Sequence, residues 1–211
     1  MKDILRFMDR HPVIEGERLI LRRMVRRDAA DLYRYASDPR VSRYLLWQPH
    51  PSLIYTERYL EEVLRQYRAH TFYDFALILK EEDRMIGTCG FTRIDPDHNS
   101  CEIGYVLSAE YWHRGLGSEA VALILRYAFS HLGFHRVQAR YMVENIRSRH
   151  VMEKNGMVFE GVAVKSAFAG GEYHDVGTCA ILREDYDPTA ALTFTLRKER
   201  PRRFFLPFSG G

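Results

Sequence analysis

The stretch Cys101–Ala120, C-E-I-G-Y-V-L-S-A-E-Y-W-H-R-G-L-G-S-E-A, decides the fold of this chain. Its first part alternates apolar and other side chains, which predicts a strand over 100–107. A short polar connection follows. The glycines at 115 and 117 then open a helix that the apolar pattern extends to about Leu132.

The glycine-rich loop before this helix is typical of an anion site. The first-turn N–H groups of a helix have no intrahelical partner, and the helix dipole adds a partial positive charge there. Glycine allows the backbone to approach a ligand closely. With Arg114 beside the loop, the sequence predicts a site that a pyrophosphate would fit.

Two other interpretations of the loop remain. Gly115–Ala120 also matches the dinucleotide fingerprint G-x-G-x-x-G/A, and Glu144 lies at the end of a later strand. That fingerprint follows its strand directly, whereas residues 108–114 intervene here and three antiparallel strands are predicted before them. The second alternative is a glycine turn that binds nothing.

Composition indicates one globular domain. The chain has 211 residues, 46% of them hydrophobic and 13% aromatic. No run approaches the ~18 apolar residues of a membrane span, and the N-terminus has no signal-peptide pattern. Cys89, Cys101 and Cys179 are odd in number and far apart. We therefore expect three reduced core thiols, a cytoplasmic location and no membrane partner. We expect no metal either, because no His, Cys and carboxylate cluster has ligand spacing.

Charge is concentrated at the C-terminus. Residues 187–211 hold five basic and two acidic residues, so the other 186 carry 26 of each sign, given 31 basic and 28 acidic in all. We expect a single domain over 1–186 and a basic, aromatic extension over 187–211 with one extra strand at Leu192–Leu196. The extension is either solvated or an RNA or ribosome contact.

Periodicity predicts the order of the remaining elements, with Asp28 capping the first helix and Gly156 ending the last. The predicted strands are Glu17–Met24, Tyr73–Lys80, Met85–Ile94, Ser100–Leu107, His135–Val143, Met157–Phe168 and His174–Leu182. The predicted helices are 27–35, a turn at Val41–Leu46, Ser52–His70, Gly115–Leu132 and Ile146–Asn155.

Seven short motifs in this order resemble the GNAT acetyltransferase superfamily, over about residues 15–186. The residues within these motifs resemble those of the RimJ/RimL branch, which acetylates protein N-termini. The motifs are E-R-L-I-L-R at 17–22, S-D-P-R-V-S at 37–42, I-G-T-C-G-F at 86–91, E-I-G-Y at 102–105, Y-W-H-R-G-L-G-S-E-A at 111–120, E-N-I-R-S at 144–148 and E-K-N-G-M at 153–157.

The resemblance implies a mixed α+β fold. Its central sheet would be mostly antiparallel and twisted, with about seven strands that splay between the fourth and fifth and about four flanking helices. Acetyl-CoA would be the cosubstrate and would lie in that splay. Its pyrophosphate would meet the N–H groups of Arg114, Gly115, Leu116, Gly117 and Ser118. Its pantetheine arm and thioester would meet the backbone of Tyr105, Val106 and Leu107 and the side chain of Asn145.

Two positions depart from the family pattern. Trp112 stands where many members have Gln or Arg, which removes one basic contact. Met152 stands where many members have a tyrosine that protonates the leaving thiolate, so a hydroxyl must come from elsewhere or water must serve.

The expected reaction is direct acetyl transfer to a primary amine, for which we select two catalytic candidates. Glu102 is our candidate base, directly or through a water, because alternation places it on one face with Gly104, which leaves room beside it. Ser148 is our candidate acid, because it lies three residues after Asn145 on one helix face. Glu102 as a surface residue and Asn145 as an ordinary N-cap are the alternatives.

The acceptor that the resemblance favours is the N-terminal α-amino group of a protein. A small amine such as a polyamine, amino acid or antibiotic stays an alternative. Met152 leaves open a non-catalytic acyl-CoA sensor, and the basic extension leaves open an RNA- or ribosome-associated factor. Either a monomer or a homodimer is compatible with the sequence.

Overall fold

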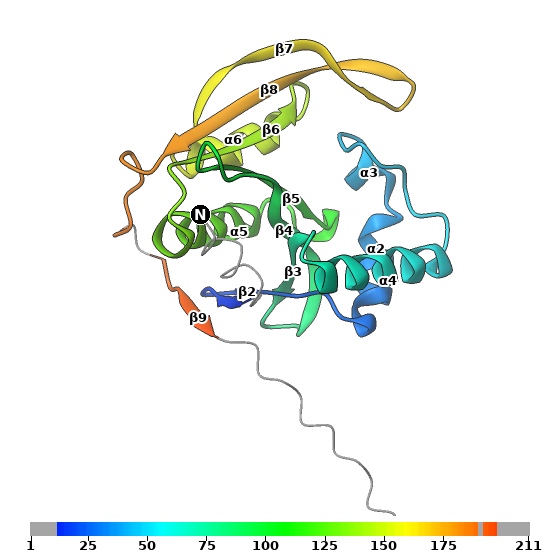
Figure 1. The fold of residues 1–211 in the computed structure, drawn as a ribbon. Coiled ribbons are helices and arrows are strands. Elements are labelled where there is room, and N and C mark those ends of the chain that lie inside the picture. The colour runs from blue at the N-terminus through cyan, green and yellow to red at the C-terminus, as the bar shows by residue number, and fades with distance from the viewer. Residues whose placement is uncertain (1–11, 190–191, 198–211) are drawn as a thin grey trace, which may run out of the picture.

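The computed structural model describes residues 12–189 and 192–197 (Figure 1). Its described strands form one nine-stranded sheet in the order β7-β8-β6-β5-β4-β3-β2-β1-β9. The predicted α+β class is confirmed, and β1 adds to the predicted strands. The strands are β1 (Val13–Glu15), β2 (Leu19–Arg22), β3 (Tyr73–Leu79), β4 (Arg84–Asp95), β5 (Ser100–Leu107), β6 (Arg136–Met142), β7 (Val158–Ala169), β8 (Glu172–Leu182) and β9 (Thr195–Arg197).

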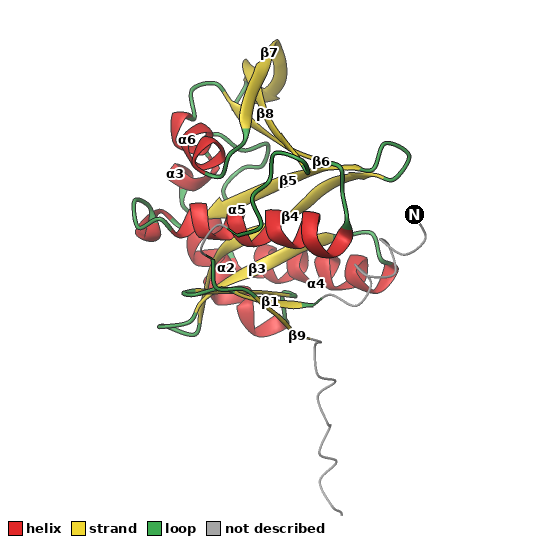
Figure 2. Cartoon of the chain, turned by 90° about the vertical axis from the view of Figure 1, so that its left-hand side faces the viewer, coloured by secondary structure: helices red, strands yellow, loops and turns green. Residues whose placement is uncertain are grey.

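Helices cover both faces of the sheet, with α2 and α4 on one side and α5 on the other (Figure 2). The helix predicted over 115–132 is α5 followed by a π-helical segment, η3. The helical segments are η1 (Arg26–Asp28), α2 (Ala29–Ala36), α3 (Pro39–Ser42), α4 (Leu53–Ala69), η2 (Ala109–Tyr111), α5 (Leu116–Arg126), η3 (Tyr127–Leu132) and α6 (Ile146–Lys154).

Strand β3 shows how the sheet separates two hydrophobic cores. Phe75, Leu77 and Leu79 point into the core beneath α5 and η3. Ala76 and Ile78 point into the core beneath α2 and α4. All five are at most 5% exposed. The nearly continuous apolar run of this strand thus arises because both of its faces are covered.

The pairing of β5 with β6 ends early, as the predicted splay requires. β5 pairs with β4 from Ser100 to Leu107, but it pairs with β6 only from Ser100 to Ile103. This ladder is parallel and joins Ile103 to Ala139 at its end. β6 then continues to Met142 beside β8. Among the described strands, the β6-facing edge of β5 therefore has no partner beyond Ile103.

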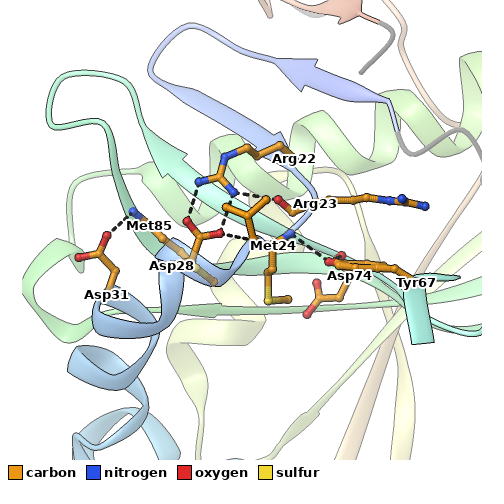
Figure 3. Close-up of polar contacts among 9 residues, drawn as sticks. Arg22, Arg23, Met24, Asp28, Asp31, Tyr67, Asp74 and Met85 are labelled. Carbon is orange, nitrogen blue, oxygen red and sulfur yellow. Dashed lines mark hydrogen bonds and ion pairs between the residues drawn. The ribbon is translucent and has the colours of Figure 1, made fainter. Parts of the chain in front are cut away.

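Asp28 connects α2 to the sheet instead of capping it in the predicted way. It stands at the N-cap of α2, but its side chain bonds no N–H of that helix. Its oxygens accept from both terminal nitrogens of Arg22, at 2.7 and 2.8 Å, and from the Val25 N–H at 2.8 Å (Figure 3). A bidentate guanidinium pair is stronger than a neutral hydrogen bond. Asp28 therefore holds the start of α2 against β2.

Tyr67 connects α4 to the sheet in a similar way. Its hydroxyl donates to the Asp74 carbonyl at 2.6 Å and accepts from the Met24 N–H at 3.3 Å (Figure 3). The residue is 2% exposed, so both bonds satisfy groups that have no access to water.

Part of the C-terminal extension joins the sheet. β9 pairs antiparallel with β1, where Leu196 opposes Ile14. Arg197 Nη2 lies 2.6 Å from Glu15 Oε2. The predicted extra strand is thus present, displaced toward 195–197. The predicted boundary after residue 186 stays a prediction, and most of the basic residues of the extension lie outside the described residues.

The cysteines are core residues, and the helices are of the length and polarity usual in globular domains. Cys89, Cys101 and Cys179 are buried and form no disulfide, in β4, β5 and β8. Across residues 12–189 and 192–197, the helices are too short or too polar to cross a membrane.

Asp74, in β3, generates a prediction about stability. Burial raises the pKa of its carboxyl to about 7, although the Thr88 side chain and the Phe75 N–H partly oppose this by bonding it. The folded chain therefore keeps a proton that the unfolded chain loses at about pH 4. The contribution of Asp74 to stability should be largest below pH 4 and fall as the pH rises to about 7.

Asp74→Asn should remove this decline, so the Tm of the variant should exceed that of the wild type by a margin that widens from pH 4 to pH 7. Thermal unfolding followed by circular dichroism measures it. Asp97→Asn, at an exposed turn position, is the matched control and should change the Tm little. A margin for Asp74→Asn that does not widen would contradict a carboxyl buried in its neutral form.

Candidate active site

A pocket of about 780 Å³ lies where β5 and β6 separate. Four segments contribute its lining: α3 with the turn after it, the end of β5, the loop before α5, and the first turns of α6. The lining residues fall within 40–45, 105–107, 111–118 and 144–151. The pocket thus brings together segments that are up to about a hundred positions apart in the chain.

The N-terminus of α5 faces this pocket as bare backbone. Gly115 is the N-cap and has a φ of 76°, which glycine adopts without strain. A Cβ on Gly117 would meet only Val151 Cγ2, at 3.7 Å. Gly115, Leu116, Gly117 and Ser118 all line the pocket, and their contact with a pyrophosphate stays a prediction. N–H groups in the first turn of a helix lack intrahelical acceptors, so this turn fits a phosphate or pyrophosphate.

Glu119 fixes this helix start and was missed by sequence analysis. Its side chain is 6% exposed. It accepts from Arg18 N at 2.8 Å, Arg18 Nε at 2.7 Å and Leu19 N at 3.2 Å. Arg18 Nη1 also donates to the Arg114 carbonyl at 2.8 Å. The signal in the sequence was a carboxylate four residues before buried Leu123, on the apolar face of the helix.

Trp112 and Arg147 form a stacked pair at the pocket. Trp112 Nε1 donates to the Leu107 carbonyl at 2.9 Å, which holds the indole against the end of β5. The Arg147 guanidinium lies 4.9 Å from the centroid of this ring, and both residues line the pocket. Arg147 thereby supplies a positive charge beside Trp112, the position where many family members have Gln or Arg. Its position in the first turn of α6, two residues after Asn145, was the available signal.

Arg114 is placed differently from the sequence prediction. Its guanidinium lies 5.1 Å from the centroid of the Tyr111 ring, and its side chain is absent from the set that lines the pocket. Arg40 and Arg43 of the α3 turn line the pocket instead, besides Arg147. A phosphate contact by Arg114 stays a prediction.

Asn145 combines a cap with a place in the pocket. Its Oδ1 accepts from the Ser148 N–H at 3.3 Å, as an N-cap does. The cap does not use the two amide N–H donors, and the residue lines the pocket. The structural and the cofactor-binding interpretations of Asn145 are therefore compatible.

Tyr105, Val106 and Leu107 line the pocket together with Ser148. The Tyr105 hydroxyl lies 2.9 Å from Ser148 Oγ and 2.8 Å from the Ser148 carbonyl oxygen. Met152, one turn further along α6, is 1% exposed and belongs to the core. The structure thus brings two hydroxyls to the helix face on which the family tyrosine is absent.

Glu102 lies apart from the other predicted residues. It shares a sheet face with Gly104, as alternation indicated, but it is not among the residues that line the pocket. Glu102 Oε2 forms an ion pair with Arg140 Nε at 2.9 Å and accepts a hydrogen bond from Gln138 Nε2 at 3.1 Å. This partnership with β6 arises because Glu102 belongs to the part of β5 where the two strands still pair.

Comparison with known proteins agrees with this geometry. The model of the acetyltransferase (GNAT) domain family matches residues 18–158. The chain belongs to the GNAT acetyltransferase family. It is therefore an acyltransferase of a family that uses acetyl-CoA. The predicted family is confirmed, and the dinucleotide interpretation of the glycine loop is set aside.

This GNAT chain resembles other acetyltransferases over most of its length. An uncharacterized N-acetyltransferase, p20, of Bacillus licheniformis is 33% identical over 81% of this chain and 96% of its own. A GNAT acetyltransferase crystal structure from Bacillus anthracis has a TM-score of 0.72 and 31% identity, over 82% of this chain and 99% of that one.

Two further relatives have named acceptors. The spermidine N(1)-acetyltransferase of Vibrio cholerae is 24% identical over 81% of this chain and 96% of its own. The ribosomal-protein-serine acetyltransferase of Escherichia coli is 36% identical over 47% of this chain and 56% of its own.

The residues of this GNAT pocket fit acetyl-CoA. The bare first turn of α5 suits the pyrophosphate, and the unpaired edge of β5 offers backbone groups to an extended amide-bearing arm. In the described part of the chain, no group of three or more His, Cys, Asp or Glu side chains is arranged to hold a metal.

Gly117→Asp should abolish coenzyme A binding while the GNAT fold persists. The new Cβ has room, and an acidic side chain at a helix N-terminus is favourable for the helix. Its charge would face the phosphates, so affinity should fall by roughly 100-fold or more. Isothermal calorimetry with coenzyme A measures this. Ser130→Asp, an equal charge change at an exposed position in η3, should bind normally. Unchanged affinity in Gly117→Asp would contradict the assignment of the loop.

Arg147→Gln and Arg114→Gln should differ in their effect on coenzyme A affinity. We expect about a tenfold loss for Arg147→Gln, because its guanidinium lines the pocket and bonds to a charged ligand are strong. Arg114→Gln should lower coenzyme A affinity no more than about fivefold, because ion pairs made by solvent-exposed side chains contribute little. Added salt should narrow both differences. A larger loss for Arg114→Gln would favour the sequence prediction over the geometry.

Proposed function

We propose that this GNAT enzyme transfers the acetyl group of acetyl-CoA to the N-terminal α-amino group of a protein. One observation carries the transfer reaction: a single pocket joins the bare first turn of α5 to the unpaired edge of β5 at Tyr105–Leu107. The first suits phosphates, and the second suits a thioester placed for attack.

The transfer is direct. Cys89, Cys101 and Cys179 are buried in strands, and none lines the pocket. Burial raises the pKa of each thiol, whereas a nucleophilic cysteine needs a lowered one. An acetyl-cysteine intermediate is therefore disfavoured, and the amine attacks the thioester within a ternary complex.

The chain has three tasks in this reaction. It must admit a neutral amine, stabilise the oxyanion and stabilise the leaving thiolate. We assign the oxyanion to backbone N–H groups of β5 near Val106 and the thiolate to Ser148. We keep Glu102 as the base and assign it a bridging water, because its carboxylate lies outside the pocket lining and is held by Arg140.

Charge at the pocket favours a protein N-terminus over a polycation. Of the described residues, Arg40, Arg43 and Arg147 line the pocket together with one carboxylate, Glu144. A polyamine would approach these cations with several positive charges, whereas an N-terminus brings one. The likeness to a ribosomal-protein-serine acetyltransferase supports the same acceptor class. A cytoplasmic location fits this proposal and the three thiols, which form no disulfide.

A small-molecule amine is the second candidate. The likeness to a spermidine N(1)-acetyltransferase covers more of this chain than the ribosomal-protein likeness does, 81% against 47%. Met152, in place of a proton-donating tyrosine, motivates a third candidate, an acyl-CoA sensor without turnover.

A panel of acceptors separates these candidates. Peptides with free N-terminal Ser, Ala or Met, the same peptides N-terminally blocked, spermidine, and free amino acids are incubated with acetyl-CoA. Thiol release and the mass of the product are then measured. We expect turnover with unblocked peptides and none with blocked ones. Faster turnover of spermidine would establish the small-amine candidate, and coenzyme A binding without any thiol release would establish the sensor.

Glu102→Gln tests the base. It keeps size and polarity but cannot accept a proton, so the rate should fall ~10²-fold or more and the acidic limb of the pH–rate profile should disappear. Arg140→Gln breaks the same ion pair and keeps the carboxylate, so it should retain that limb. Equal rate losses in both variants would show that the ion pair has only a structural role.

A further inference from the structure

Tyr105 and Ser148 form a hydroxyl pair whose hydrogen-bond directions are determined by chemistry. A carbonyl oxygen can only accept, so the single proton of the Tyr105 hydroxyl is donated to the Ser148 carbonyl, at 2.8 Å. The 2.9 Å contact between the two hydroxyl oxygens must then be donated by Ser148. In this structure the Ser148 O–H therefore points at the Tyr105 oxygen.

The backbone around Ser148 is also held. Its N–H donates to the Asn145 carbonyl at 3.0 Å and to Asn145 Oδ1 at 3.3 Å. Tyr105 comes from the part of β5 that lies beyond its pairing with β6, and Ser148 comes from the first turn of α6. The pair therefore joins β5 to α6, and both members line the pocket.

The pair occupies the place of the missing family phenol. Ser148 and Met152 are four residues apart, so they share one face of α6. The family pattern puts a tyrosine at the position of Met152, whereas this chain reaches the same helix face with a tyrosine from the neighbouring strand.

We propose that Tyr105 is a positioning residue that orients the Ser148 hydroxyl, and that Ser148 stabilises the sulfur of the leaving coenzyme A by hydrogen bonding. This inference rests on the proposed acetyl transfer. In that step the amine nitrogen forms a bond to the acetyl carbon, the carbon–sulfur bond breaks, and its electron pair goes to sulfur. The amine proton leaves to water or a base, and the thiolate later takes a proton from solvent.

Neither hydroxyl loses its proton in this step. Burial raises the pKa of the Tyr105 phenol, although its bond with Ser148 partly opposes the rise. A thiol is more acidic than either hydroxyl, so the thiolate does not deprotonate them. Ser148 instead turns its O–H from Tyr105 toward sulfur, and the Tyr105 O–H can follow it from the carbonyl to Ser148 Oγ. The stabilisation therefore needs no titrating group of the protein.

Bound coenzyme A reports this stabilisation without turnover. The thiolate absorbs in the ultraviolet, so the pKa of the bound thiol can be titrated spectroscopically. Hydrogen bonding to the thiolate should lower this pKa in the wild type. Tyr105→Phe and Ser148→Ala should each raise it toward the value of free coenzyme A. At pH 9 each should weaken coenzyme A binding about tenfold, as the loss of one bond to a charged group does. Binding of desulfo-coenzyme A, which has no thiol, should not change.

Two further variants separate positioning from packing. Tyr105→Phe/Ser148→Ala should match Ser148→Ala alone, because Tyr105 acts through Ser148. Tyr127→Phe is the matched control: its phenol is buried in the α5-side core, and its oxygen has no hydrogen-bond partner among the described residues. It should leave the thiol pKa unchanged.

The outcomes are distinguishable. The inference is overturned if Tyr105→Phe leaves the thiol pKa and the affinity ratio of coenzyme A to desulfo-coenzyme A as in the wild type. Equal weakening of both ligands by Tyr105→Phe would also overturn it, because the tyrosine would then serve only pocket shape. A wild type that binds neither ligand would refute the proposed function itself, and this inference with it.

Discussion

The early end of the ladder between β5 and β6 is the constraint on which the site depends. It is the single parallel pairing among the described strands, and it stops at Ile103 and Ala139. β6 stays with β8 beyond that point, and the Tyr141 ring lies over Gly177 of β8, where a Cβ would come within 2.5 Å of Tyr141 Cζ. This close packing of an aromatic ring on a cross-strand glycine belongs to the pairing of β6 with β8, which continues where the pairing of β6 with β5 has ended. The backbone of β5 that loses its partner is the backbone that lines the pocket.

The two faces of the sheet are fixed to this frame by buried polar contacts. On one face Glu119 joins the first turn of α5 to β2. On the other face Asp28 joins α2 to β2, and Tyr67 joins α4 to β3. Buried carboxylates and hydroxyls are costly without partners, so each contact specifies one arrangement of helix against strand. The helix start that suits phosphates is positioned by the same means.

The departures of this chain from the family pattern are compensated by residues that are neighbours in space. Trp112 lacks the charge usual at its position, and Arg147 stacks on its ring from α6. Met152 lacks a hydroxyl, and Tyr105 brings one from β5 to the same helix. In both cases the replacement comes from an element that the fold places alongside. The charge and the hydroxyl of the family pattern are therefore present in this pocket, but residues at other positions in the chain supply them.

The sequence by itself determined the order of elements, the class of fold and the glycine loop, and most of the site residues that it predicted line the pocket. These follow from local chemistry: the apolar period, the positive φ that suits Gly115, and the N-cap at Asn145. It did not determine the directions and partners of long polar side chains. Glu102 was correctly placed on its sheet face, but its pairing with Arg140 depends on where β6 still lies beside β5. Arg114 was correctly placed beside the loop, but Tyr111 stacks with its side chain. Glu119 and the Tyr105–Ser148 pair join residues from about 40 to 100 positions apart. Such contacts exist only after the sheet and helices have packed, so only the tertiary structure decided them.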